Sequence, residues 1–452
     1  MSAEFVSPDR IRTRFSRAMS NMYRQEVPQY GTLLQLVGEI NAGVLAERPA
    51  GQVPDEGELA RLDVERHGAI RLGTPEELAT MREVFAVMGM FPVGYYDLAE
   101  AGVPVHATAF RPVDEAALAH NPFRVFTSLL RLELIDDEPL REQARRILAA
   151  RDIFTPRLRE LLAEWRRQGG LSDRQADEFV MEALETFRWH SHATVDRPTY
   201  ERLHEVHRLI ADVVCFRGPH INHLTPRTLD IDATQAAMPE HGITPKATIE
   251  GPPRRECPIL LRQTSFRALE ESILFAGEEE GSHTARFGEI EQRGMALTPR
   301  GRELYDQLLS ASKATTGGLS GEAHQQALAE AFREFPDDET VLRREGLGYF
   351  RYHLTEQGRR QAGTGTLPEE AEALIERGLI EASPIIYEDF LPVSAAGIFQ
   401  SNLGDSGTGK YAQGDNQAAF EAALGVTVHD PFALYEAISQ ESLATCRRAL
   451  QG

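Results

Sequence analysis

An internal repeat is the feature of this sequence that most restricts its fold. The stretches that begin at His67 and His223 each carry an arginine four residues later, Arg71 and Arg227, and each runs into a helix-start signal. A unit that buries only one face has to pair with its copy to complete a core. We therefore predict two βαβββ modules that form a curved sheet around a cavity, with both histidines facing it. The alternative is two unrelated histidines among the 14 of the chain.

Local patterns place the elements of each module. In the first, Thr74 followed by Pro75 and two acidic residues is typical of a helix start. The elements predicted for it are a strand at 67–73, a helix at 74–88 and strands at 91–98, 106–110 and 123–129. The elements predicted for the second are an extended run at 223–231, a helix at 232–238 and strands at 246–250, 258–266 and 285–292. The flanking stretches 8–47, 137–207 and 298–378 have mainly helical periodicity.

The length of 452 residues suggests two to four structural units. We expect an α+β fold with a core of two βαβββ modules that form a curved sheet, together with helical additions. The predicted regions are an N-terminal helical region (1–60), the first module (61–135), a helical insertion (136–212), the second module (213–300), a helical region (301–380) and a C-terminal region (381–452).

The charge balance narrows the choice of partner. Lys and Arg number 48 against 69 Asp and Glu, which gives a net charge of −21. Such a surface repels nucleic acid and anionic membranes, so we expect neither as a partner. It also repels small acids, so an acidic substrate would need a local basic group. The sequence does not indicate an oligomeric state.

Cysteine use and hydropathy point to a cytoplasmic protein. Cys215, Cys257 and Cys446 are an odd number, far apart and without CxxC spacing, so we predict neither a disulfide framework nor a zinc ribbon. No window approaches about 18 uninterrupted apolar residues, and residues 1–17 lack the apolar segment of a secretory signal.

A pair of acidic residues completes a candidate metal site. Glu289 and Glu291 are two apart in the last predicted strand, so they share one face of it. Two histidines and one carboxylate form the facial triad of non-heme Fe(II) oxygenases, which leaves positions for a chelating substrate and O2. The alternative is a solvated edge strand, where alternating acids are ordinary.

Longer runs carry a family resemblance. The strand Glu-Ile-Glu-Gln-Arg resembles the closing strand of 4-hydroxyphenylpyruvate dioxygenase, a member of the vicinal oxygen chelate superfamily. The chain more closely resembles the 2-oxoadipate dioxygenase/decarboxylase family, also called hydroxyglutarate synthase. The runs that carry this resemblance are ERHGAIR, MGMFPVGYYDL, GVPVHATAFRP, NPFRVFTSLLRLELI, HINHLTPRTLDID, PILLRQTSF, SHTARFGEIEQRG and YEDFLPVSAAGIFQSNLG.

The resemblance implies an Fe(II) enzyme that converts 2-oxoadipate and O2 to 2-hydroxyglutarate and CO2 in lysine catabolism. It implies that the metal ligands and catalytic residues are His67, His223 and Glu289. His220 competes with His223, but only His223 keeps the spacing to the Asp-Ile pair of related modules. Glu291 competes with Glu289, but only Glu289 keeps the Glu-x-x-Gln-Arg spacing.

The resemblance also implies that Arg71 binds substrate together with His67, Val393 and Ser394, the last two in the C-terminal region. Independently, Arg71 lies four residues after His67 in a strand, on the same face and roughly 13 Å away. A guanidinium matches a carboxylate with two parallel hydrogen bonds, so this spacing favours a 2-oxo acid with a second, remote carboxylate. The alternative for Arg71 is a surface ion pair.

Two rival functions stay open at this point. One is a glyoxalase-like isomerase or lyase with zinc or nickel on the same scaffold, and the other is a binding protein without catalysis. The run Gly404–Lys410 matches GxxxxGK, but Tyr411 replaces the Ser or Thr that binds magnesium, so we interpret it as a surface loop and not as a nucleotide site.

Overall fold

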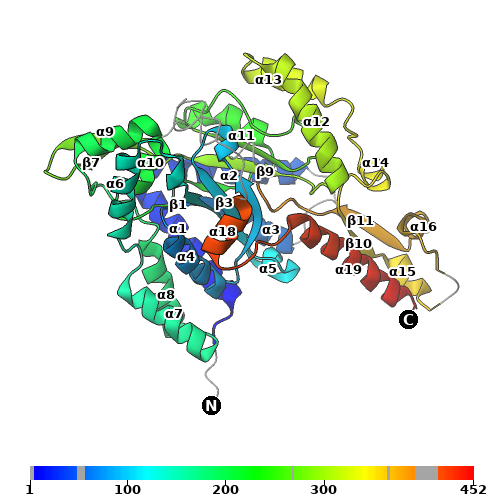
Figure 1. The fold of residues 1–452 in the computed structure, drawn as a ribbon. Helices are drawn as coiled ribbons and strands as arrows, with labels where there is room; N and C mark the ends of the chain where they lie inside the picture. Colours follow the sequence, from blue (N-terminus) through cyan, green and yellow to red (C-terminus); the bar gives the residue numbers. More distant parts are fainter. Residues whose placement is uncertain (1–4, 48–55, 267–268, 364–366, 392–415, 452) are drawn as a thin grey trace. The chain divides into compact units, whose positions relative to one another are not determined.

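The computed structural model describes residues 5–47, 56–266, 269–363, 367–391 and 416–451. The chain divides into two compact units (Figure 1). Unit 1 comprises residues 1–246, 263–291 and 390–429, and unit 2 comprises residues 247–262, 292–389 and 430–452. Helices and mixed sheets confirm the α+β class. The Gly-rich run 404–414, Val393 and Ser394 lie outside the described residues.

Unit 1 is built around a five-stranded mixed sheet with the order β2-β3-β4-β1-β5. Its strands are β1 (Arg66–Leu72), β2 (Phe91–Asp97), β3 (Val105–Arg111), β4 (Arg124–Leu130) and β5 (Leu224–Pro226). β1 runs parallel to β4 and antiparallel to β5, and β3 is antiparallel to both β2 and β4. Every residue of β3 and β4 is buried, so both faces of the sheet are covered.

The first predicted module is confirmed strand for strand. Helix α4 (Pro75–Val87) connects β1 to β2 and begins where the sequence predicts, because the Thr74 side chain accepts a hydrogen bond from the Glu77 backbone N–H. The predicted helix at 8–47 is two helices, α1 (Pro8–Glu26) and α2 (Pro28–Glu47). Pro28 causes the break, because proline lacks the N–H that a continuous helix needs.

The second predicted module differs in part. Its first strand, β5, is only three residues long and joins the sheet of the first module, and its helix is α11 (Ile231–Ala237). β6 (Leu261–Ser265) pairs with β9 (Glu289–Arg293), as a separate two-stranded sheet. The predicted strand at 246–250 is wrong: only isolated bridges flank it, and Pro245, Pro252 and Pro253 interrupt regular pairing around it.

Helices form the rest of unit 1, apart from one hairpin that the sequence did not indicate. The hairpin consists of β7 (Glu270–Leu274) and β8 (Glu280–Thr284), which are antiparallel. The remaining helices are α3 (Glu56–Val64), α5 (Glu115–His120), α6 (Glu138–Ala149), α7 (Pro156–Gln168), α8 (Asp173–Glu185), α9 (Arg197–Val206), α10 (Arg208–Val214) and α18 (Asn416–Leu424), with short 3-10 turns at Ala99–Ala101, Leu132–Leu134 and Met238–His241.

Unit 2 is mostly helical around a two-stranded antiparallel sheet. The strands are β10 (Phe350–Leu354) and β11 (Ile380–Pro384). The helices are α12 (Pro299–Thr316), α13 (Gly321–Ala331), α14 (Glu339–Arg344), α15 (Glu356–Gln361), α16 (Ala371–Glu376) and α19 (Pro431–Gln451). Across the described parts of both units, no helix combines the length and apolarity that a membrane crossing requires.

Candidate metal centre

Three buried side chains from separate strands converge inside unit 1. His67 lies in β1, His223 immediately precedes β5, and Glu289 begins β9. One candidate ligand atom from each lies within 4.8 Å of the others. The sheet explains two of these positions, because the antiparallel pairing of β5 with β1 sets Thr225 opposite His67 and so brings His223 alongside.

Glycine lets these segments approach closely. A Cβ atom on Gly68 would lie 2.5 Å from the Ile221 side chain and 3.1 Å from the His223 carbonyl oxygen. Only glycine therefore fits between His67 and the segment that carries His223. On the third segment, Gly288 gives the ring of Phe266 the space that a Cβ would fill, directly before Glu289.

The polar atoms of this site are only partly satisfied. Glu289 Oε1 accepts hydrogen bonds from Thr225 Oγ1 and Gln263 Nε2, both at 3.0 Å, and lies 2.9 Å from His67 Nε2 and 3.8 Å from His223 Nε2. Among the described residues, Glu289 Oε2 and both ring nitrogens of His223 have no hydrogen-bond partner. Buried polar atoms are rarely left so, and a metal ion would satisfy them.

The electrostatics suit metal ligands. Burial lowers the pKa of His223 to about 4, so its imidazole is neutral at pH 7 and has a lone pair to give. Burial would raise the pKa of Glu289, but His223 and His67 bring it below its ordinary value, so it is a carboxylate. The donor set of two imidazoles and one carboxylate fits a divalent metal and leaves positions for a chelating ligand.

Glu291 also lies close to His67, but at the opposite ring nitrogen from Glu289. Its Oε2 lies 2.8 Å from His67 Nδ1, although that nitrogen makes no hydrogen bond of standard geometry among the described residues. Burial would lower the pKa of His67, but Glu291 and Glu289 raise it above its ordinary value. Glu289 is therefore the carboxylate that lies near both histidines, as the spacing of the closing strand predicts.

Arg71 is buried on the same strand as His67. It forms an ion pair, but with a buried partner, so the surface ion pair considered in the sequence analysis is not the one that the structure shows. Its Nη1 donates to Asp212 Oδ2 at 2.6 Å, and Asp212 Oδ1 accepts from His283 Nε2 at 2.9 Å. His220 Nε2 lies 3.5 Å from the same Asp212 oxygen. His220, the competitor of His223, thus belongs to this second cluster.

Sequence reasoning missed Asp212 and His283. One signal was available for Asp212: it is the single acid in the otherwise apolar α10 segment Leu209–Val214, where an unpaired charge is costly. His283 sits in the polar β8 strand and gave no such signal.

An aromatic residue closes one side of the site. The Phe390 ring meets the His67 ring edge-on with centroids 4.9 Å apart, and it meets Phe126 at 5.3 Å. Val393 and Ser394 follow directly but lie outside the described residues.

Comparisons with known proteins all match the chain to one enzyme family. The sequence model of the 2-oxoadipate dioxygenase/decarboxylase family matches residues 15–402. A protein of that name from Escherichia coli K12 is 60% identical over 446 residues, 98% of this chain and 99% of its own. One from Mycobacterium tuberculosis H37Rv is 42% identical over 95% of this chain and 97% of its own.

A solved structure is similar over the same length. The crystal structure of hydroxyglutarate synthase from Pseudomonas putida, in complex with 2-oxoadipate, has a TM-score of 0.92 and 58% identity, and the match covers 99% of each chain. The fold and the sequence therefore agree over nearly the whole chain.

Proposed function

Because this chain belongs to the 2-oxoadipate dioxygenase/decarboxylase family, we propose that it converts 2-oxoadipate and O2 to 2-hydroxyglutarate and CO2. We propose Fe(II) as its metal, held by His67, His223 and Glu289. The observation that carries the proposal is the buried His-His-Glu set, in which both ring nitrogens of His223 and Glu289 Oε2 lack hydrogen-bond partners among the described residues. A facial triad of this composition is typical of Fe(II) oxygenases.

The metal, when bound, supplies the oxygen chemistry, and the chain supplies binding and orientation. Thr225 and Gln263 hold one oxygen of Glu289, which fixes the direction of the carboxylate. Phe390, against His67, presents an apolar ring that keeps water away from this side. The scheme requires no protein acid or base.

Arg71 is proposed to bind the remote carboxylate of the substrate. Its guanidinium is buried, and its charge lies close enough to lower the pKa of His223. A 2-oxo acid that chelates the metal through its carboxylate and keto oxygens extends its second carboxylate several ångströms away, within reach of a long side chain. Val393 and Ser394 remain part of the proposed substrate site. The three cysteines are free, which agrees with the cytoplasmic location that we propose.

Oxygen consumption tests the proposed function. The purified protein, loaded with Fe(II), is mixed with 2-oxoadipate in a sealed cell while O2 and CO2 are measured. We expect one O2 consumed per CO2 released and no turnover without iron. With labelled O2, one labelled atom should enter the new carboxylate and one the new hydroxyl, less any exchange with water. Product formation without O2 would contradict the proposal and favour an isomerase or lyase. Absence of turnover with any 2-oxo acid would favour a binding protein.

A further inference from the structure

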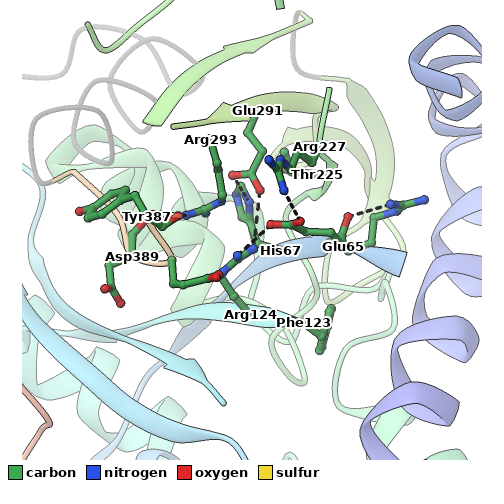
Figure 2. A network of polar contacts seen from close by, with 12 residues as sticks. Glu65, His67, Phe123, Arg124, Thr225, Arg227, Glu291, Arg293, Tyr387 and Asp389 are labelled. Atoms are coloured by element: carbon green, nitrogen blue, oxygen red, sulfur yellow. Dashed lines mark hydrogen bonds and ion pairs between the residues drawn. The ribbon is translucent and has the colours of Figure 1, made fainter. Parts of the chain in front are cut away.

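Two acids on β9 lie against opposite nitrogens of one imidazole. Glu289 Oε1 is 2.9 Å from His67 Nε2, and Glu291 Oε2 is 2.8 Å from His67 Nδ1. All three side chains are at most 1% exposed. Because Glu289 is the acid that also approaches His223, Glu291 lies at the ring nitrogen of His67 that is opposite the candidate metal centre. Figure 2 shows Glu291 beside His67.

Glu291 is itself part of a buried cluster of carboxylates and guanidiniums, shown in Figure 2. Arg124 donates to Glu65 at 2.8 Å and its other terminal nitrogen lies 3.8 Å from Glu291. Arg227 donates to the second oxygen of Glu65 at 2.9 Å, and Arg61 Nε lies 3.3 Å from that oxygen. Guanidiniums thus face both carboxylates, which is what permits charged groups to stay buried.

The backbone fixes this cluster as firmly as the side chains do. Arg227 is the β-bridge partner of Glu291, and the Thr228 N–H donates to the Glu291 carbonyl at 2.7 Å. Glu65 and Arg124 flank His67 in the sheet, because Glu65 precedes β1 and Arg124 is the register partner of His67 in β4. The cluster therefore surrounds His67 from three segments.

We propose that Glu291 is a positioning residue that holds the proton of His67 on Nδ1, so that the Nε2 lone pair faces the metal, and that Glu65, through Arg124 and Arg227, holds Glu291 in place. The inference rests on the proposed function, since it assumes that His67 ligates a metal ion. A carboxylate that accepts the remote N–H of a ligating histidine fixes its tautomer and makes it a stronger donor.

The test is a metal titration of the full chain after the metal has been removed with a chelator. Co(II) is the probe, because its visible absorption reports the ligand geometry. Glu291→Gln removes the charge at constant size, and we expect its dissociation constant to rise 10- to 100-fold with an unchanged spectrum. The matched control is Glu77→Gln, which removes the charge from another buried Glu–Arg pair, that of Glu77 with Arg151. This pair is not part of the metal site, so the control should bind Co(II) like the wild type.

Two results would overturn the proposal. An unchanged dissociation constant in Glu291→Gln would mean that Glu291 does not act on His67. A loss as complete as in Glu289→Gln, with an altered spectrum, would mean that Glu291 is a ligand. If Glu291→Gln fails to fold, Glu291→Asp replaces it, because aspartate keeps the charge but is one methylene shorter. We expect this variant to bind Co(II) about tenfold more weakly. Unchanged binding would contradict the proposal. If Glu289→Gln and the wild type bind alike, the proposed function itself fails instead.

Discussion

Strand β1 contributes to two buried polar clusters, through His67 and through Arg71 four residues later, and the clusters differ in how completely the oxygens of their carboxylates are bonded. The metal cluster consists of His67, His223 and Glu289. The arginine cluster consists of Arg71, Asp212, His220, His283 and Tyr200. In the arginine cluster both oxygens of Asp212 accept hydrogen bonds, one from Arg71 and one from His283.

In the metal cluster, by contrast, one oxygen of Glu289 and both nitrogens of His223 lack a hydrogen-bond partner among the residues that the structure covers. Leaving a buried polar atom without a partner costs about 1–3 kcal/mol. A chain keeps such atoms where a ligand completes them, whereas a carboxylate with both oxygens bonded holds its partners in place. The difference supports our proposals that the first cluster binds the metal and that the second positions Arg71.

The largest expected effect separates His223 from His220, its competitor in the sequence. His223→Ala should abolish both metal retention and turnover, because it removes one of three ligands. His220→Ala should retain the metal, because His220 Nε2 lies against Asp212 at 3.5 Å. Metal content after dialysis and O2 consumption measure both effects. The reverse result, with metal lost only in His220→Ala, would exchange the roles of the two clusters.

The second prediction concerns Arg71. Arg71→Ala should lower kcat/KM for 2-oxoadipate about 10- to 150-fold, which corresponds to the 1.5–3 kcal/mol of a charge-assisted hydrogen bond. Metal content should stay that of the wild type. A monocarboxylic 2-oxo acid of matched length should lose much less, and an equal loss would make Arg71 structural.

Removing Arg71 alone leaves Asp212 buried without its cation, which could unfold the protein. The double variant Arg71→Ala/Asp212→Asn removes that charge as well and serves as the control. The double variant should have a larger free energy of unfolding in chemical denaturation than Arg71→Ala. It should still discriminate poorly between 2-oxoadipate and the monocarboxylic 2-oxo acid.

The sequence predicts the parts of this comparison that are local. Thr74 and Pro75 mark the start of α4 from neighbours alone. Glu289 and Glu291 share one face of β9, so strand periodicity cannot tell them apart. Only the family resemblance favours Glu289, because Glu289 keeps the family's spacing to Arg293.

What the sequence could not predict depends on distant residues. The pairing of Asp212 with Arg71 spans 141 residues, and Glu65 meets Arg227 across 162. No local pattern encodes such contacts. The β7–β8 hairpin was missed for another reason: its strands are largely exposed and Glu-rich, so they lack the apolar alternation that indicates a strand.

The third prediction concerns pH and the helix that carries Asp212. His207 Nδ1 accepts a hydrogen bond from the Leu209 N–H at 3.1 Å and so caps α10. Burial lowers the pKa of His207 to about 4, below the ordinary 6.5. Between these values the unfolded chain binds a proton that the folded chain excludes, so this residue costs stability as the pH falls from 6.5 toward 4. At pH 5 the cost is about 2 kcal/mol.

His207→Asn is the matched variant, because asparagine caps a helix without titrating. Urea unfolding at pH 7.5 and pH 5 should show a smaller drop in unfolding free energy for the variant than for the wild type. All other histidines are common to both proteins, so the difference isolates His207. Equal drops would mean that His207 does not stay neutral in the folded protein, and the link between α10 and acid sensitivity would be lost.

The smallest expected effect tests how far the support of Arg71 extends. Tyr200 Oη lies 2.8 Å from His283 Nδ1, whose other nitrogen donates to Asp212. Tyr200→Phe removes only this hydroxyl, at a cost of about 1 kcal/mol in unfolding free energy. Because two hydrogen bonds separate His283 from Arg71, kcat/KM for 2-oxoadipate should fall by no more than about fivefold, mainly through KM.

The control for this prediction is Tyr30→Phe, which removes a different hydroxyl contact, with Ser20 at 2.9 Å, in helix α2. It should lose similar stability and leave KM unchanged. The comparison of the two variants separates support of Arg71 from general stability. If Tyr200→Phe damaged turnover as much as Arg71→Ala, the hydroxyl would have to act on the substrate itself, and the arginine cluster, like the metal cluster, would be a binding site and not only a support.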